Sequence, residues 1–416
     1  MAQLDLTVYQ PMLKEHYTQD RVELACYKDN PLLAILSKYT QFGGKNLPIS
    51  IQYGIPGGRS ATYASAKANK TPSAFKEFFL TRNHDYALAD IDNETIEASM
   101  GNANAMLEAL TNEIDSAMLS ASRSLAAAAY GDGSGAIGQV SATPSNSSGT
   151  FTVTLANVDD IANFEVGLTL NVWSALTGGT QRTSDGSDNS WPIAAVDRSA
   201  GTLTLTGTYS GSGTFAANDY LFVEGDRGGK LKGLLSWIPF TAPTSGDSFF
   251  QVDRSVDTTR LAGVRYDGSA VPIEEALIEG ASRIGREGYS PDYCFMNFSK
   301  WSTLEKSLSS KIRYEMVQVP LTGAHGATIG FKAIAIEGPR STIKVIPDHN
   351  CPSNYTWMLS MDYWKLYSLG SAPKMLMSDG NKFLRVTDAD SVEARIGYYA
   401  QLGCRAPGAN AIIKLS

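Results

Sequence analysis

In the first hundred residues, two runs of the chain have hydrophobic residues that alternate with other residues, which is the period of a β-strand. In the first run the large apolar side chains stand at every second position, at Leu47, Ile49, Ile51, Tyr53 and Ile55. The second run covers residues 75–82, and small, polar and partly basic residues fill 57–72 between the two. The pattern predicts a long β-hairpin whose tip is too poor in apolar residues to build a core of its own.

The tip of this hairpin is a candidate contact site. The tip has three cationic side chains that could contact another molecule, those of Arg59, Lys67 and Lys70. Its single large apolar residue is Tyr63. Such a protrusion is a mobile surface loop unless another molecule supplies its packing. The residues alone leave both interpretations open.

A long helix is predicted next. Apolar residues recur at alternating spacings of four and three, at Ile96, Met100, Ala103, Leu107, Leu110, Ile114, Ala117 and Ala121. Asp90, Asp92 and Asn93 offer N-caps, and Gly131 and Gly133 end the run. The result is one helix of about 35 residues, roughly 50 Å long. Because the stripe is poor in large apolar residues, we expect the helix to lie along a sheet rather than in a coiled coil.

Between residues 140 and 229 the composition changes. Gly, Ser, Thr and Asn dominate, and short alternating runs at 151–155 and 202–205 are separated by glycine-rich turns. Helical periodicity is absent. We therefore expect a compact all-β module inserted into a mixed protein.

The rest of the chain mixes both kinds of element. A short helix is predicted after Asn30-Pro31, since proline is tolerated in a first turn. Further helices are predicted at 272–287 and 299–308. Strands are predicted at 293–296, 331–336, 342–346, 357–361, 364–367 and 392–402.

Composition narrows the function classes. The chain has 416 residues, of which 43% are hydrophobic and 19% charged, so it is globular. Its net charge is −7 and it has no run of four basic residues, which argues against a nucleic-acid reader. No signal peptide and no stretch of about 18 apolar residues is present, so we expect no membrane span. The four cysteines, Cys26, Cys294, Cys351 and Cys404, form no CxxC and are expected to be buried free thiols.

The sequence contains motifs typical of cofactor binding or catalysis, but the residues around each motif argue against that function. Residues 133–138 match GxGxxG, but they follow a predicted helix instead of opening one. Residues 225–230 resemble a P-loop, yet Leu231 stands where Ser or Thr should hold Mg²⁺. Asp388 and Asp390 could form an acid–base pair, although a solvated turn is the better explanation. We expect no catalytic residue and no cofactor.

A metal site is not expected either. His16, His84, His325 and His349 form no HExxH or comparable pair. Cys351 lies two residues after His349, but a third and a fourth ligand are not evident.

Several segments of the second half together carry a family resemblance. They are residues 291–298 with Trp301 and Leu304, then 355–359, 363–366, 393–395 and 406–411. In their order and spacing they resemble the major capsid proteins of tailed bacteriophages, whose fold recurs in the floor of herpesvirus capsids. The resemblance covers most of the chain; the exception is the inserted module.

The resemblance implies an α+β fold with a fixed order of parts. In this numbering they are an N-terminal arm (1–40), an extended loop formed by the hairpin (41–90), a spine helix with the peripheral domain (91–139), the β-rich insertion (140–229), a return to the peripheral domain (230–260), an axial domain (261–370) and late strands that return to both sheets (371–416). Arg59, Tyr63, Lys67 and Lys70 then become candidate intersubunit contacts.

The resemblance also implies a function and partners. The chain would assemble with itself into pentamers and hexamers of an icosahedral or prolate shell, which encloses double-stranded DNA without sequence-specific binding. Assembly would take place in the host cytoplasm, with a portal and with a separate scaffolding protein or a segment removed before Met1. Decoration proteins that bind the assembled shell are compatible with this function. Some relatives crosslink the extended loop, but no Lys, Asn and acid align here, so this is not carried over.

Two other function classes stay open. A phage or surface adhesin would use the β-rich module at 140–229 to bind glycans. An enzyme ranks third, because each motif tested above fails in its context.

Overall fold

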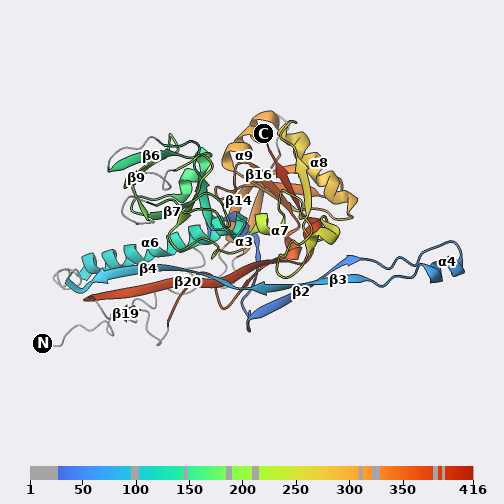
Figure 1. Ribbon diagram of the computed structural model, residues 1–416, viewed down its shortest axis with the longest axis horizontal. Coiled ribbons are helices and arrows are strands. Elements are labelled where there is room, and N and C mark those ends of the chain that lie inside the picture. The colour runs from blue at the N-terminus through green and yellow to red at the C-terminus, as the bar shows by residue number, and fades with distance from the viewer. Residues whose placement is uncertain are drawn as a thin grey trace.

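The computed structural model describes residues 27–94, 103–144, 149–183, 190–208, 215–308, 313–320, 328–377, 383–386 and 389–415. An elongated base carries two compact lobes on one side, and a hairpin projects from one end of the base (Figure 1). Within the described part, no helix is long and apolar enough to cross a membrane.

The base is built on a six-stranded sheet, which we call the peripheral sheet. Its members are β1 (Ser37–Tyr39), β4 (Asn83–Asp92), β17 (Trp364–Ser368), β18 (Lys374–Met375), β19 (Phe383–Arg385) and β20 (Ser391–Cys404). The long strand β20 pairs with all of them except β1, which runs parallel to β17. Strands from the two ends of the sequence therefore share one sheet.

Strand β4 corrects the prediction made for its residues. Asp90 and Asp92 were expected to cap the long helix, but both lie in β4 and pair with β20. Residues 83–92 also stand outside the hairpin, because they belong to the peripheral sheet. The error has a physical source. An exposed strand end rich in aspartate has the same composition as a helix N-terminus.

Helix α6 (Ala103–Tyr130) lies along the peripheral sheet (Figure 1). The helix has 28 residues and contacts β4 and β20. Ile114, Ala117 and Ala121, three positions of the predicted stripe, are buried. The small residues let the helix approach the sheet closely, so the weak stripe indicates a helix on a sheet, as expected. The predicted start of this helix, at residues 95–102, lies outside the described residues.

Helix α3 (Pro31–Ile35) has proline in its first turn, as predicted. Leu32 and Leu33 are buried in the main core. Asn30, just before the helix, donates to the Ser122 hydroxyl of α6 at 3.3 Å and accepts from the Asn350 amide at 2.8 Å. The short helix thereby links the base to the second lobe.

The inserted lobe is a closed barrel. Its elements are β5 (Ala136–Gln139), β6 (Thr150–Thr154), the 3-10 helix η1 (Val158–Asn163), β7 (Thr169–Trp173), β8 (Trp191–Asp197), β9 (Thr202–Thr206) and β10 (Tyr220–Val223). The strand order is β5-β10-β7-β8-β9-β6. A bridge between Val140 and Leu155 joins the first strand to the last. Trp191, Phe151 and Phe215 pack edge to face in a hydrophobic core separate from the rest.

The second lobe contains a seven-stranded sheet, the axial sheet. Its order is β11 (Val264–Asp267), β21 (Ala411–Lys414), β16 (Tyr355–Leu359), β12 (Tyr293–Met296), β15 (Thr342–Pro347), β14 (Thr328–Glu337) and β13 (Tyr314–Pro320). Helices α8 (Ile273–Arg286) and α9 (Phe298–Leu308) cover one face. Along β12, Cys294 and Met296 point into the core under these helices, while Phe295 points into the main core.

Asn410 joins the two sheets where the chain passes from β20 to β21. Its side chain is fully buried. The Oδ1 atom accepts from the Ser360 amide at 2.8 Å and from the Trp364 indole at 2.9 Å, and Nδ2 donates to the Ala406 carbonyl at 2.9 Å. A buried amide with these partners stabilises the crossing, which accounts for the polar residue in the 406–411 motif.

A charge cluster ties the end of the inserted lobe to the base. The Lys230 ammonium lies 2.6 Å from the Asp85 carboxylate of β4 and 3.0 Å from Asp226. It also donates to the Ser124 hydroxyl of α6 at 3.0 Å. Burial raises the pKa of Asp226, and the charge of Lys230 opposes that rise. One largely buried cation therefore serves two carboxylates.

Candidate assembly surfaces

The projecting hairpin has a firmly packed base. Strands β2 (Asn46–Gly54) and β3 (Ala74–Thr81) pair antiparallel along their whole length. Ile49 and Ile51 are buried on β2, and Phe78 and Leu80 on β3. The Phe78 ring lies 5.3 Å from that of Trp237, on the short helix α7 (Leu234–Trp237). These anchors fix the direction in which the hairpin leaves the body.

The far end of the hairpin carries a short helix, α4 (Tyr63–Ala68), where a loop without secondary structure was expected. The Thr62 hydroxyl donates to the Ser65 hydroxyl at 2.8 Å, and the Gly57 amide donates to the Thr71 hydroxyl at 2.7 Å. Local hydrogen bonds of this kind order the tip without a core. No residue of α4 is buried, so the expectation of a tip without its own packing holds.

All four candidate contact residues lie on this tip and are exposed. Tyr63 has 84% of its surface accessible. Arg59, Lys67 and Lys70 are exposed too, and no described residue forms an ion pair with them. Two apolar residues that flank the tip add to the set, Ile55 and Phe75, at 74% and 59% exposure.

We call residues 55–75 the tip segment. Ile55 and Phe75 were not singled out from the sequence, because an alternating apolar residue on a strand is normally expected to face a core. Together with Tyr63 and the three cations, they place three kinds of contact on one segment: aliphatic, aromatic and cationic.

Two surfaces of the base have the opposite charge. On the open face of β4, Tyr86 and Leu88 are 50% and 59% exposed, and Asp90 and Asp92 follow on the same face. On α6, Glu113 and Asp115 are exposed. Each surface could receive a cationic segment, and the β4 face also offers apolar area.

The glycine-rich motifs are turns. Residues 133–138 follow α6 and lead into β5, and Gly135 has φ +84°. A Cβ there would lie 2.4 Å from the Asp226 carbonyl oxygen, so this position requires glycine. In residues 225–230, Gly225 and Gly228 also have positive φ. Neither segment opens a helix, and neither therefore presents the backbone amides that hold a phosphate.

The candidate metal and thiol residues that the structure describes do not form a site. Among the residues described, no three His, Cys, Asp or Glu side chains lie close enough to hold a metal. His349 stacks on Phe298, whereas the Cys351 thiol points to the Phe295 carbonyl. Burial raises the pKa of Cys294 to about 12 and also raises that of Cys351 and Cys404. These thiols stay protonated and unreactive near neutral pH.

Other sequence candidates fall partly outside the described residues, among them Cys26, His16, His325 and Asp388. Asp390 is exposed and accepts a hydrogen bond from the Asn93 amide, which fits a surface turn.

The inserted barrel touches both neighbouring parts of its own subunit. Its Glu165 pairs with Arg123 of α6 at 3.0 Å. Asn157, before η1, accepts from the Ser353 hydroxyl of the second lobe, which we call the axial lobe after its sheet, at 3.1 Å. The barrel therefore braces the axial lobe against the base.

Asp160 of η1 predicts a pH-dependent stability for this brace. Burial raises its pKa to about 6, although Asn157 donates to its carboxylate. A folded-state pKa above the unfolded value favours folding below about pH 4, and this contribution is lost as the pH rises through about 6. We therefore expect Asp160→Asn to raise the melting temperature at pH 7.5 and to raise it clearly less at pH 4.5. Two pKa units correspond to about 2.7 kcal/mol, and partial exposure reduces the expected gain to about 1–2 kcal/mol.

Thermal melts of the subunit at both pH values measure this effect. Asp159→Asn, at the exposed neighbouring position, removes only a charge that adds to the raised pKa of Asp160 and should therefore give a smaller gain at pH 7.5. An equal gain from Asp160→Asn at both pH values would show that titration of this carboxyl is not its cause.

Comparison with known proteins adds a family to this geometry. Residues 213–414 match the family described as the SU10 major capsid protein. This match and the fold support the recognition of the chain as a major capsid protein of the tailed-phage kind. The fold of this capsid protein is similar to that in the structure "Cyanophage A-1(L) capsid asymmetric unit", at 12% identity and a TM-score of 0.51, with 93% of each chain covered. It is less similar to "Mycobacterium phage Ogopogo", at 9% identity and a TM-score of 0.41, covering 94% and 93%. No curated protein matches the sequence.

The capsid protein forms a shell from many copies of itself and is part of the virion. The expected α+β capsid fold is confirmed. Family and fold point to a structural role rather than an enzymatic one.

Proposed function

We propose that the capsid protein encloses packaged double-stranded DNA in an icosahedral or prolate shell, and that the hairpin is the arm by which each copy holds a neighbour. The observation that carries the second part is the contrast along the hairpin. Its base is buried in its own subunit, while its tip extends away from the body and buries no residue of α4 (Figure 1). A neighbouring copy would supply the packing that the tip lacks.

Charge supports this arm. Residues 57–72 contain three cations and no acid, in a chain whose net charge is −7. Opposite charges on a repeated subunit favour contact between the tip of one copy and an acidic face of the next. The β4 face with Asp90 and Asp92 and the α6 face with Glu113 and Asp115 are the two receivers that we propose.

The stabilising effect of each contact is small but is repeated. An exposed ion pair contributes only about 0–1 kcal/mol. Burial of Ile55, Tyr63 and Phe75 against a neighbour would contribute more, at about 25 cal/mol for each Å² of apolar surface removed from water. Because every copy both gives and receives an arm, the shell multiplies the contact.

Hydrogen exchange on free and assembled protein tests the arm. Amides of residues 57–72 should exchange fast in the free subunit, because the helix at the tip is one short turn without buried residues. In shells the same amides should exchange at least about tenfold more slowly, which corresponds to about 1.4 kcal/mol of protection.

Amides of β20 provide the internal control, since they are protected by the peripheral sheet in both states. Equal and fast exchange of 57–72 in both states would mean that no neighbour covers the tip. Slow exchange in the free subunit would mean that the tip is already packed without one.

The remaining partners follow from the family alone. We propose that assembly takes place in the host cytoplasm with a portal and a separate scaffolding protein, and that decoration proteins are an optional addition. The predicted absence of an active site remains a proposal as well.

A further inference from the structure

The axial sheet ends on both sides in an edge strand, β11 at one end of the strand order and β13 at the other. Assembly into pentamers or hexamers, on which this inference rests, turns such a lobe into one unit of a ring. In a ring the contact is heterologous: one side of each copy meets the opposite side of the next. The two edges are therefore the places to look for matching features.

The β13 edge carries a protruding apolar side chain beside a cation. Met316 is 70% exposed and Tyr314, two residues earlier on the same face, is 47% exposed. Lys332 of β14 stands opposite Met316 in the register. Its ammonium lies 4.1 Å from the centre of the Tyr314 ring, and its nearest carboxylate, Glu305, is 3.8 Å away. That distance leaves the ammonium able to take a closer partner.

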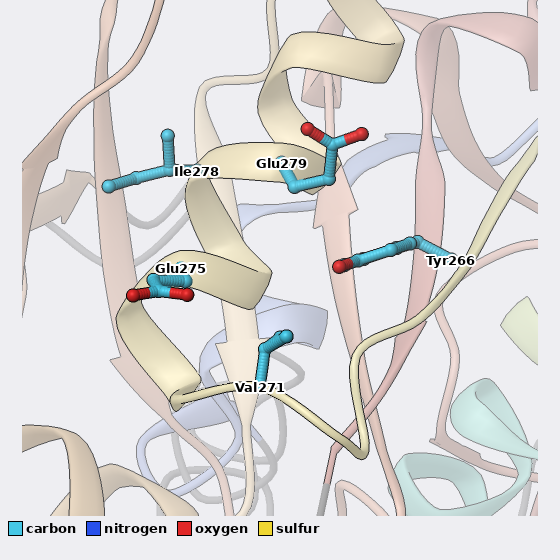
Figure 2. Close-up of a pocket in the computed structure, with 5 residues that line it drawn as sticks. All are labelled: Tyr266, Val271, Glu275, Ile278 and Glu279. Atoms are coloured by element: carbon cyan, nitrogen blue, oxygen red, sulfur yellow. The ribbon is translucent and has the colours of Figure 1, made fainter.

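The β11 edge carries a hollow of about 340 Å³. Tyr266 of β11 and Val271 face the outer side of α8 across it, and Ile278 lies on the helix between two carboxylates (Figure 2). Ile278 is 51% exposed. Of the two acids, Glu279 pairs with Arg283 at 2.9 Å, whereas Glu275 has no ion pair within the described residues.

We propose that Met316 of one copy enters the hollow of the next copy around the capsomer, and that Lys332 pairs with Glu275 there. The match is one of shape and of charge. An unbranched, flexible methionine suits an irregular apolar hollow. The cation beside it meets the one acid at the hollow that lacks a partner. The partner is thus a second copy of this chain, seated edge to edge.

The arrangement accounts for three features that the isolated subunit leaves unexplained: an exposed methionine, an exposed isoleucine and a glutamate with no ion pair in the described part of the chain. Each copy supplies one protruding Met316 and one hollow. The contact therefore repeats around a ring of five or six copies, and every hollow in the ring is filled. It differs from the hairpin arm, which leaves the end of the base away from the inserted lobe (Figure 1).

A charge exchange tests the ion pair. Lys332→Glu and Glu275→Lys should each lower the yield of shells at least about fivefold, since each places like charges together. The double variant should recover most of the yield, because the pair is restored in reverse. Thermal melts of the free subunits separate assembly defects from folding defects. Single variants that assemble as the wild type does, or a double variant worse than both singles, would overturn the pairing.

A thiol pair tests the position of Met316. Shells of Met316→Cys/Ile278→Cys treated with a short bismaleimide should give a ladder of covalent oligomers that ends at five or six chains. Each single cysteine variant, and the wild type with its native thiols, should stay monomeric on the same denaturing gel.

The two levels of the proposal fail in different ways. If the double-cysteine variant forms normal shells but its chains stay monomeric on the denaturing gel after bismaleimide treatment, the edge contact is overturned. The capsid role is then unaffected. A wild-type chain that forms no shells under any assembly condition would contradict the proposed function itself, before the edge is tested.

Discussion

Replacing Lys230 with methionine is expected to lower the free energy of unfolding by about 3 kcal/mol at pH 8. Removing one partner of a buried ion pair typically costs about 3–5 kcal/mol, because the other charge is left without compensation. Here two carboxylates lose their cation, those of Asp85 and Asp226. We place the effect at the lower end because the three side chains keep 10%, 15% and 21% of their surface exposed.

The loss should depend on pH with a definite sign. Burial already raises the pKa of Asp226, and Lys230 counteracts that rise. Without Lys230 the folded-state pKa rises further above the unfolded value of about 3.9. The folded variant then holds a proton that the unfolded chain has lost, so its stability falls as the pH rises through that window. The difference between variant and wild type should therefore be smaller at pH 5 than at pH 8.

Thermal melts of the unassembled subunit at the two pH values measure both effects. The double variant Lys230→Met/Asp226→Asn is the matched control, and it should recover part of the loss because one of the two orphaned charges is gone. Asp226→Asn alone should not lower the stability, since Lys230 keeps Asp85 and burial already raises the pKa of Asp226. A Lys230→Met subunit that melts like the wild type at pH 8 would show that the cluster is solvated and does not stabilise the fold.

This cluster shows where prediction from sequence ends. Lys230 is 145 positions from Asp85 and 106 from Ser124, so no local pattern connects them. Even the P-loop likeness around it pointed elsewhere. The hairpin strands and helix α8 are the opposite case. Their periodicity follows directly from one buried face, and the structure places them within a residue or two of the expected bounds.

Strands at the edges of sheets and on the surface were harder to predict from the sequence. β4 was missed because its outward face carries Tyr86 and Leu88 as well as two aspartates, so apolar and polar positions do not alternate clearly. β11 has only four residues, and β13 combines exposed and buried apolar side chains. The apolar residues of these strands are buried only against another strand or, as we propose for β13, against another copy of the chain. A single-chain pattern cannot record that burial.

The four tip residues lie exposed, and their role as intersubunit contacts stays a prediction. Absence of a core could be read from composition, since residues 57–72 hold a single large apolar side chain. Which surface covers these residues could not be read from composition. Ile55 and Phe75 show why: a strand pattern alone does not tell whether an apolar residue faces its own subunit, a neighbour or water.

Removing the hairpin tip is expected to abolish shell formation and to leave the subunit folded. A variant with Gly-Gly in place of residues 57–72 keeps both strands and their buried residues, which lie in 46–54 and 74–81. Its melting temperature as a free subunit should stay within about 2 °C of the wild type, because α4 contributes no buried residue. Shell yield, measured by sedimentation and electron microscopy, should fall more than about tenfold.

Charge variants then identify which face receives the arm. Asp90→Lys/Asp92→Lys and Glu113→Lys/Asp115→Lys each reverse one acidic surface without touching a buried residue. The pair that lies under the arm should weaken assembly, and the defect should be relieved in combination with Arg59→Glu/Lys67→Glu/Lys70→Glu. The other pair serves as the control. Tipless subunits that build shells of normal size and yield would contradict the arm, because a neighbour cannot depend on a segment that is gone.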